Sequence, residues 1–222
     1  MTQLLIATPV DGGDTQTARV TLGYAQFVAA LTHALGAETL DSTIMFCCDV
    51  VRARNRAAAY VLRELRHITH VLWLDDDTYP PDARDGVEMV RRMLALDVPL
   101  VAAPYPRKRQ GGGWTHEPLP YALPDERGLV SVLAVGFGFT MTTAACLRDL
   151  SERAETYYDL PHPHRVANVF GQVLVDAGDG RRILASEDGS FCHRWRDTGG
   201  RVAMLAQSAA VVHVGAKGYT GA

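Results

Sequence analysis

The sequence has few cysteines, no long apolar run and no excess of charge of either sign. Its four cysteines include no C-x-x-C pair, and Cys47 and Cys48 are adjacent, so we expect reduced thiols rather than a disulfide framework or a zinc site. No apolar segment approaches the length that spans a bilayer, and the first residues lack the basic region of a secretory signal. We therefore expect a cytoplasmic protein with no export signal and no membrane segment.

The charge balance excludes a global attraction to polyanions. Lysine and arginine number 22 against 25 aspartates and glutamates, which gives a formal net charge of -3. Binding to nucleic acid or to an anionic membrane would need a local basic patch. With 222 residues, of which 47% are hydrophobic, the chain is long enough for one well-buried domain and short for two. We therefore treat 1–222 as a single domain.

Apolar runs and amphipathic segments alternate through the first half of the chain. This pattern predicts an α/β fold with a mostly parallel, Rossmann-like sheet flanked by helices. Right-handed crossovers would bring the loops that follow the strands to one edge of that sheet. The expected strands are 4–10, 43–48, 70–74 and 99–104, and the expected helices are 20–35, 50–65 and 82–96. Residues 1–107 form the expected nucleotide-binding half.

The alternation becomes irregular after Pro104. We expect a basic, glycine-rich lid at 107–113, a strand at 129–137 and a helix at 142–154. A hairpin is expected within 166–185, with its turn at Gly178-Asp179-Gly180. A helix that begins after Ser186 and ends before Gly199-Gly200 follows, and the last expected strand is 201–214. Residues 128–222 therefore form the expected acceptor and catalytic half, with the hairpin region on its acceptor side.

Three adjacent aspartates, Asp75, Asp76 and Asp77, follow the apolar run 70–74. Adjacent carboxylates repel one another, and a divalent cation bound by oxygen ligands keeps them ionised at a strand end. Strand alternation places Asp75 and Asp77 on one side and Asp76 on the other, so Asp75-x-Asp77 is the expected unit. A solvated acidic loop is the alternative interpretation.

Acids and a late histidine supply further candidates. Glu187 and Asp188 follow Ser186 at the start of a helix, where the helix dipole favours carboxylates, so they either cap the helix or act in catalysis. His213 follows the last expected strand, and its imidazole suits a transition metal such as Mn²⁺. A packed or surface histidine is the alternative.

Basic residues and glycines complete the set of candidates. The guanidinium of Arg54 either binds two oxygens of a nucleotide or its diphosphate, or it lies on a solvated helix face. The run that contains Arg107 and Lys108 either closes over a diphosphate or is an ordinary loop, and Lys217 in the tail could reach the same phosphates. Gly136 and Gly138 either allow a sugar to approach the backbone or serve a bend.

The order of these features resembles that of GT-A-fold nucleotide-sugar glycosyltransferases, similar to family 2. The resemblance covers nearly the whole chain and is carried by Thr8-Pro9, Arg54-Asn55, Asp75-x-Asp77, Gly136-Phe137-Gly138, Glu187-Asp188 and His213. It implies a UDP- or GDP-sugar donor that lies across the strand ends, with Mn²⁺ or Mg²⁺ bridging its diphosphate. It does not name the sugar.

The resemblance also implies residue roles. Asp188 would be the general base of an inverting transfer to an acceptor hydroxyl, supported by Glu187, and Asp75, Asp77 and His213 would bind the metal. The expected donor-binding residues are Thr8, Pro9, Arg54, Asp75, Asp76, Arg107, Lys108, Gly136, Gly138 and Lys217. The sequence does not choose among a glycan, a small molecule, a protein and a modified nucleic acid as the acceptor, and it leaves a homo-oligomer open.

Three other functions compete with this one. A phosphatase would place Asp-x-Asp after the first strand with a threonine two residues on, whereas position 79 is tyrosine, so we set it aside. A nucleotidyltransferase shares the metal and carboxylate chemistry, but it usually has a glycine-rich, basic segment after its first strand, where this chain has Asp11-Gly12-Gly13-Asp14. A non-catalytic module that binds a nucleotide sugar is the third.

Overall fold

The structure is a computed structural model, and it describes residues 2–10, 22–46, 49–107, 113–159 and 164–213. Its helices are α1 (Leu22–Leu35), α2 (Val50–Arg63), α3 (Ala83–Leu96), α4 (Ala144–Arg153) and α5 (Glu187–Asp197). Its strands are β1 (Leu4–Val10), β2 (Leu40–Phe46), β3 (His70–Leu74), β4 (Thr78–Tyr79), β5 (Leu100–Ala102), β6 (His116–Pro118), β7 (Leu129–Val135), β8 (Phe139–Thr143), β9 (Thr156–Tyr158), β10 (Arg165–Ala167), β11 (Leu174–Asp176), β12 (Arg182–Leu184), β13 (Ala203–Leu205) and β14 (Val212–His213).

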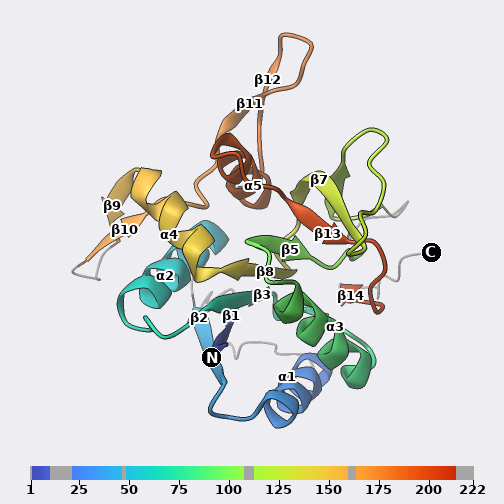
Figure 1. Ribbon diagram of the computed structural model, residues 1–222. Coiled ribbons are helices and arrows are strands. Elements are labelled where there is room, and N and C mark those ends of the chain that lie inside the picture. Colours follow the sequence, from blue (N-terminus) through green and yellow to red (C-terminus); the bar gives the residue numbers. More distant parts are fainter. Residues whose placement is uncertain (1, 11–21, 47–48, 108–112, 160–163, 214–222) are drawn as a thin grey trace.

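One eight-stranded sheet runs through the molecule in the order β2-β1-β3-β8-β5-β13-β7-β6 (Figure 1). Strands β1, β2 and β3 are parallel, and β13 is parallel to β5. The sheet is mixed, because β8 lies antiparallel between β3 and β5, and β7 is antiparallel to β13. Its parallel strands end at a common edge, as the alternating pattern predicts.

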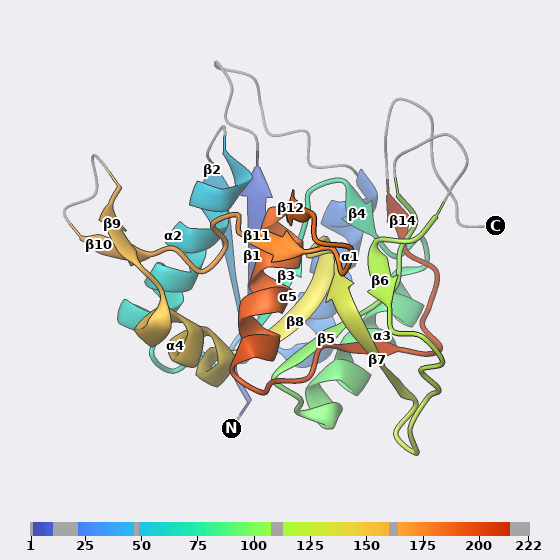
Figure 2. The ribbon, with the colours of Figure 1, turned by 90° about the horizontal axis from the view of Figure 1, so that it is seen from above.

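Helices cover both faces of this sheet. Along β3, Val71 and Trp73 pack with residues of α2, α4 and α5, whereas Leu72 and Leu74 pack with residues of α1 and α3. All five residues of β3 are buried, because a strand covered on both faces has no solvent side. The expectation of an α/β fold with helices on both sides is therefore confirmed (Figure 2).

Side chains and glycines fix the ends of the helices. Asp82 accepts hydrogen bonds from the backbone of Arg84 and Asp85 and so caps α3. Ser186 accepts one from Gly189 at 3.1 Å and caps α5, as expected. Gly36, beyond the end of α1, has φ +86°, a backbone conformation that glycine adopts without strain.

The first half follows the expected elements closely, but the second half differs from them. Strand β8 was not expected, because its Thr-Met-Thr-Thr segment precedes a helical pattern that we extended back to residue 142, whereas Thr143 caps α4. The expected strand 201–214 is two short strands, β13 in the main sheet and β14 paired with β4. The hairpin is present as β11 and β12, but residues 165–167 belong to β10, which pairs with β9.

In the described part of the chain, no helix is both long and apolar enough to cross a bilayer.

Candidate functional site

A cleft of about 1270 Å³ opens at the edge where the parallel strands end. Its walls come from the ends of β1 and β3, the segment after β5, the β6–β7 pair, the start of α5 and the β11–β12 hairpin. The cleft is acidic, because Asp75, Asp76, Asp77, Glu117, Asp176, Glu187, Asp188 and Asp197 line it with three arginines, Arg54, Arg107 and Arg196. The cleft is therefore suited to a cation or to a ligand that brings one with it.

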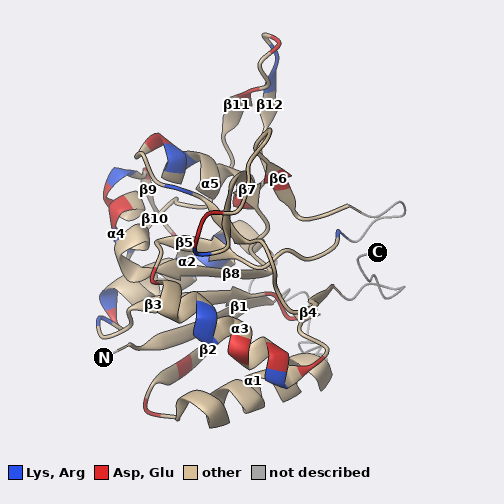
Figure 3. Cartoon of the chain, turned by 45° about the vertical axis from the view of Figure 1, so that its right-hand side comes forward, with Lys and Arg blue, Asp and Glu red and all other residues tan. Residues whose placement is uncertain are grey.

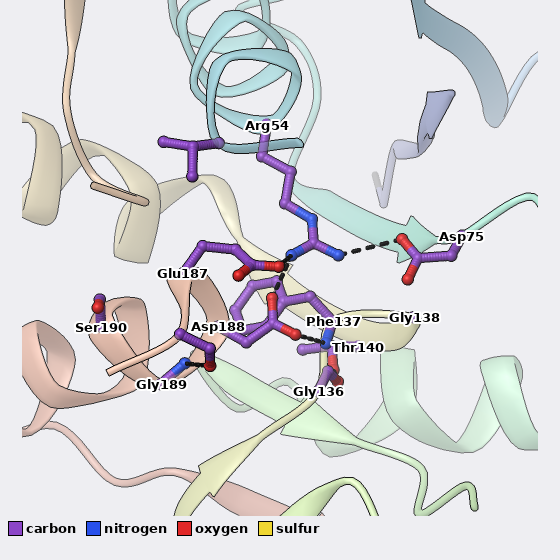
Figure 4. Close-up of polar contacts among 12 residues, drawn as sticks. Arg54, Asp75, Gly136, Phe137, Gly138, Thr140, Glu187, Asp188, Gly189 and Ser190 are labelled. Atoms are coloured by element: carbon purple, nitrogen blue, oxygen red, sulfur yellow. Dashed lines mark hydrogen bonds and ion pairs between the residues drawn. The ribbon is translucent and has the colours of Figure 1, made fainter. Parts of the chain in front are cut away.

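Arg54 holds the centre of the cleft together. It projects from α2, its side chain is only 2% exposed, and its guanidinium contacts three carboxylates (Figure 4). One terminal nitrogen lies 3.1 Å from Asp75 Oδ1, and the other contacts Asp188 and lies 3.3 Å from Glu187 Oε1. The guanidinium also lies over the rings of Phe137 and Phe170, at 5.7 and 5.8 Å from their centroids.

The neighbouring carboxylates keep Arg54 protonated. Burial alone would lower its pKa, but the carboxylates of Asp188, Asp75 and Glu187 outweigh burial and raise it. The side chain is therefore a fixed positive charge that offsets part of the acidic cluster. We expected Arg54 to bind a nucleotide or a diphosphate, and the structure instead pairs both terminal nitrogens with carboxylates of the protein.

Asp188 lies in the first turn of α5 and connects three parts of the fold. One carboxylate oxygen contacts Arg54, and the other accepts a hydrogen bond from the backbone nitrogen of Phe137 at 3.0 Å. Burial raises the pKa of Asp188 to about 7, Arg54 opposes this rise, and Glu187 and Asp75 add to it. A carboxylate has about four acceptor positions, so one that accepts two hydrogen bonds can still take a proton.

Asp77 and His213 meet on the other side of the cleft, as expected. The pairing of β14 with β4 sets His213 opposite Thr78, and this register brings His213 Nε2 to 3.6 Å from Asp77 Oδ1. His213 Nδ1 lies 2.9 Å from the carbonyl oxygen of Pro106. Because that carbonyl can only accept, Nδ1 carries a proton and donates it to Pro106, and Nε2 is the ring nitrogen that faces Asp77.

The structure separates Asp75 from this pair. The chain leaves β3 at Leu74 and turns, with the backbone nitrogen of Thr78 bonded to the carbonyl of Asp75 at 3.1 Å. Strand alternation therefore does not apply here, and all three aspartates line the cleft. Asp75 pairs with Arg54 and Asp77 lies beside His213, so the expected metal-binding set of Asp75, Asp77 and His213 does not form as one group.

Mn²⁺ or Mg²⁺ therefore has two candidate protein ligands, Asp77 and His213. Among the residues that the structure describes, no group of three histidine, cysteine, aspartate or glutamate side chains is arranged to bind a metal. The pair nevertheless fits one, because a ligating histidine typically donates its second ring nitrogen to a carbonyl or a carboxylate. Phosphate oxygens of a ligand would have to supply the remaining coordination positions.

Several expected donor-binding residues have other roles. Thr8 is buried, and its hydroxyl lies 2.6 Å from that of Tyr24, whereas Pro9 lines the cleft. The backbone nitrogen of Gly138 donates to Tyr105 Oη at 2.8 Å. A Cβ at Gly136 or Gly138 would lie 2.4 or 2.7 Å from that oxygen, so both glycines make room for Tyr105, and Gly136 also lines the cleft.

The basic run is described only in part. Arg107 lines the cleft, and its Nε donates to the carbonyl of Trp114 at 2.6 Å. Lys108 and Lys217 lie outside the described residues, so their expected contacts with phosphates stay predictions.

Sequence reasoning missed Tyr105 as part of the site. This tyrosine is buried, and burial, followed by Asp75 and Asp188, raises its pKa well above its usual value, so its hydroxyl stays protonated. It also packs edge-on to His213, with ring centroids 5.2 Å apart. The sequence did contain one indication of this role: Tyr105 lies between Pro104 and Pro106, at the end of an expected strand. Ligands bind at that edge of a parallel sheet.

Comparisons with known proteins support the fold and name no function. No protein-family model matches the sequence, and no curated protein sequence matches it. A solved structure described as A197 from STIV is similar, with a TM-score of 0.56 and 18% sequence identity over 96% of this chain and 86% of that chain. At this identity the likeness concerns the arrangement of helices and strands alone.

Proposed function

We propose that this protein is a metal-dependent glycosyltransferase with a GT-A-type fold, which transfers a sugar from a UDP- or GDP-sugar to an acceptor hydroxyl. The observation that carries the proposal is the pairing of Asp77 with His213 Nε2 in a cleft that also contains Asp188. Its support is chemical, because a carboxylate and an oriented imidazole suit Mn²⁺, and a separate carboxylate with a raised pKa suits a base.

The two sides of the cleft would divide the reaction. Asp77 and His213 would hold Mn²⁺ or Mg²⁺, which, when bound with the diphosphate, neutralises the charge that builds on the leaving group. Arg107 lines the same cleft and can add positive charge near the phosphates. Asp188 would take the proton of the acceptor hydroxyl as the hydroxyl oxygen forms the new bond to the anomeric carbon, while the bond from that carbon to the diphosphate breaks and the nucleoside diphosphate leaves.

Arg54 has a positioning role in this scheme. One terminal nitrogen of Arg54 contacts a carboxylate oxygen of Asp188, and the other contacts Asp75 at the end of β3. Arg54 therefore links the proposed base to the end of β3. Because the backbone nitrogen of Phe137 fixes the second oxygen, the carboxylate of Asp188 has little freedom to rotate. The base is thereby oriented before any acceptor arrives.

The test is calorimetric binding of UDP and GDP with and without Mn²⁺. We expect metal-dependent binding that Asp77→Ala abolishes, while Asp85→Ala, a change in the first turn of α3, leaves it intact. Binding that is equal with and without the metal would contradict the proposal. Donor binding without transfer to any acceptor and without slow hydrolysis would instead favour a non-catalytic nucleotide-sugar binding module.

A further inference from the structure

The β11–β12 hairpin stands away from the body of the protein and presents an apolar stripe to the cleft. Both strands project beyond α5, as Figures 1 and 3 show. Within the described part of the chain, residues 174–184 make hydrogen bonds only to one another. The hairpin is therefore an arm attached at its base, where the backbone nitrogen of Val173 donates to Ser190 Oγ at 3.0 Å.

The register of the hairpin sorts its side chains onto two faces. Val175 pairs with Ile183, whereas Leu174 pairs with Leu184 and Asp176 with Arg182 on the opposite face. The first face continues at alternate positions to Ala177 and Ala185, and Val175, Ala177, Ile183 and Ala185 all line the cleft. We call these four residues the apolar stripe. Of the opposite face, Asp176 and Leu184 also line the cleft, whereas Leu174 and Arg182 do not.

The apolar stripe is exposed and leads directly to the candidate base. Ile183 is 52% exposed, a high value for a large aliphatic side chain on a surface that encloses a cleft. Ala185 precedes Ser186, Glu187 and Asp188 in the sequence, whereas the Asp77–His213 pair comes from β4 and β14. The stripe is thus joined to the Asp188 side of the cleft, where the acceptor would enter.

We infer that the apolar stripe binds an apolar group of the acceptor, so that the substrate is a hydroxyl compound with an alkyl or aryl substituent rather than a wholly polar glycan. This inference rests on the proposed function for the role of the bound molecule as an acceptor. Burial of the exposed part of Ile183 would supply the binding energy. A strand rises about 3.3 Å per residue, so Ala185 and Ile183, the stripe residues of β12 and its base, lie ~7 Å apart along the strand, a distance that suits a short chain or one ring.

The experiment measures binding of matched glycosides by calorimetry. Methyl and hexyl β-glycosides of glucose, galactose and mannose are compared below micelle-forming concentrations, in the presence of UDP and Mn²⁺. We expect at least one hexyl glycoside to bind about tenfold more tightly than its methyl counterpart, the gain that burial of about two of its methylenes would give. Ile183→Ser should remove that difference.

Leu174→Ser is the matched control, because Leu174 is a similarly exposed aliphatic residue, 49% exposed, on the opposite face of the same hairpin. It should keep the preference for the hexyl glycoside. Equal binding of methyl and hexyl glycosides for every sugar would overturn the inference, as would an equal loss in the two variants. A dimer that Ile183→Ser dissociates, measured by light scattering, would also overturn it, since the stripe would then contact a second copy of the chain.

The glycoside experiment and the nucleotide-binding experiment, the latter done with Mn²⁺ and with Mg²⁺, together separate the two proposals. If UDP and GDP do not bind with either metal, the proposed function fails. A hexyl preference that disappears in Ile183→Ser and survives in Leu174→Ser would still establish the apolar binding site. If the nucleotides bind and the hexyl preference is absent, only the inference about the acceptor fails.

Discussion

A single buried arginine determines how the acids of the cleft coexist. Arg54 is the shared partner of Asp75, Glu187 and Asp188, and its side chain is 2% exposed. Removing one partner of a buried ion pair leaves charge that neither water nor protein compensates, which costs more than the pair itself contributes. Arg54 is thus a structural requirement for the acidic site as well as a positioning residue.

Arg54→Met should lower the free energy of unfolding by about 2–4 kcal/mol, because the three carboxylates would lose their shared counterion while remaining partly buried. Urea denaturation measures the change. Arg63→Met is the control, since Arg63 is 38% exposed and its pair with Glu64, at 3.7 Å, is on the surface. That variant should stay within about 0.5 kcal/mol of the parent. Equal losses would show that the carboxylates do not depend on Arg54.

The raised pKa of Asp188 predicts the pH dependence of transfer. A base acts in its ionised form, so the rate should fall as the pH falls below about 7, rather than near the ordinary pKa of an aspartate. Initial rates between pH 5 and 9 at saturating donor and metal measure this. Asp188→Asn should lower the rate by a factor of ~10² to 10⁴ and remove the dependence.

Asp176→Asn provides the control for that profile. Asp176 also lines the cleft, but it lies on the hairpin, where its Oδ1 accepts a hydrogen bond from the backbone nitrogen of Gly178 at 2.8 Å. The variant should keep the same fall in rate at low pH. A rate in the parent protein that is constant from pH 8 to pH 5 would exclude Asp188 as the base.

At the scale of elements, the first turn of α5 has both a structural and a chemical role. Ser186 caps the helix, and the two following residues bring their carboxylates to Arg54. The cap fixes where the helix begins, and the start of the helix fixes the position of Asp188. Capping and catalysis, which the sequence presented as alternatives for Glu187 and Asp188, are therefore compatible.

Ser186→Ala should cost about 1 kcal/mol of stability and should also lower the transfer rate, because the first turn of α5 would be held less firmly. Thr143→Ala is the matched control. Thr143 caps α4 by accepting a hydrogen bond from the backbone nitrogen of Cys146 at 3.1 Å, and it pairs with His70, at the start of β3, away from the cleft. The two variants should unfold at similar urea concentrations, and only Ser186→Ala should lose activity. Equal transfer rates in the two variants would show that the Ser186 cap does not affect the candidate site.

At the scale of the molecule, the alternating first half was predictable and the mixed second half was not. The segment from β1 to β5 has local signals, namely apolar runs of strand length and helices with caps. Apart from the short strand β4, which was not expected, its elements appeared close to the expected positions. Strand β8 has no such signal, because Thr140 and Thr142 are polar in sequence but fully buried in the sheet. Trp73 Nε1 donates to Thr142 Oγ1 at 2.9 Å, a partner that no local pattern discloses.

The candidate site divides in the same way. Positions at strand and helix ends, such as Asp77, Glu187 and Asp188, were predicted to face one cleft, and they line it. The pairings were not predictable, because they depend on contacts between distant segments. Arg54 and Asp188 are separated by 134 residues, and Asp75 is diverted to Arg54 by a turn that strand alternation does not anticipate.

The position of β8 also determines when β3 and β5 can be joined in one sheet. Strand β3 borders β8 on one side, and β5 borders it on the other, so the two strands have no direct hydrogen bonds to each other. When only the residues up to the end of β5 have left the ribosome, the strand that lies between β3 and β5 has not yet emerged. During synthesis, β3 and β5 can therefore be joined only after Thr143 has left the exit tunnel, and a fragment cut after residue 107 would leave each of these strands with an unpaired edge.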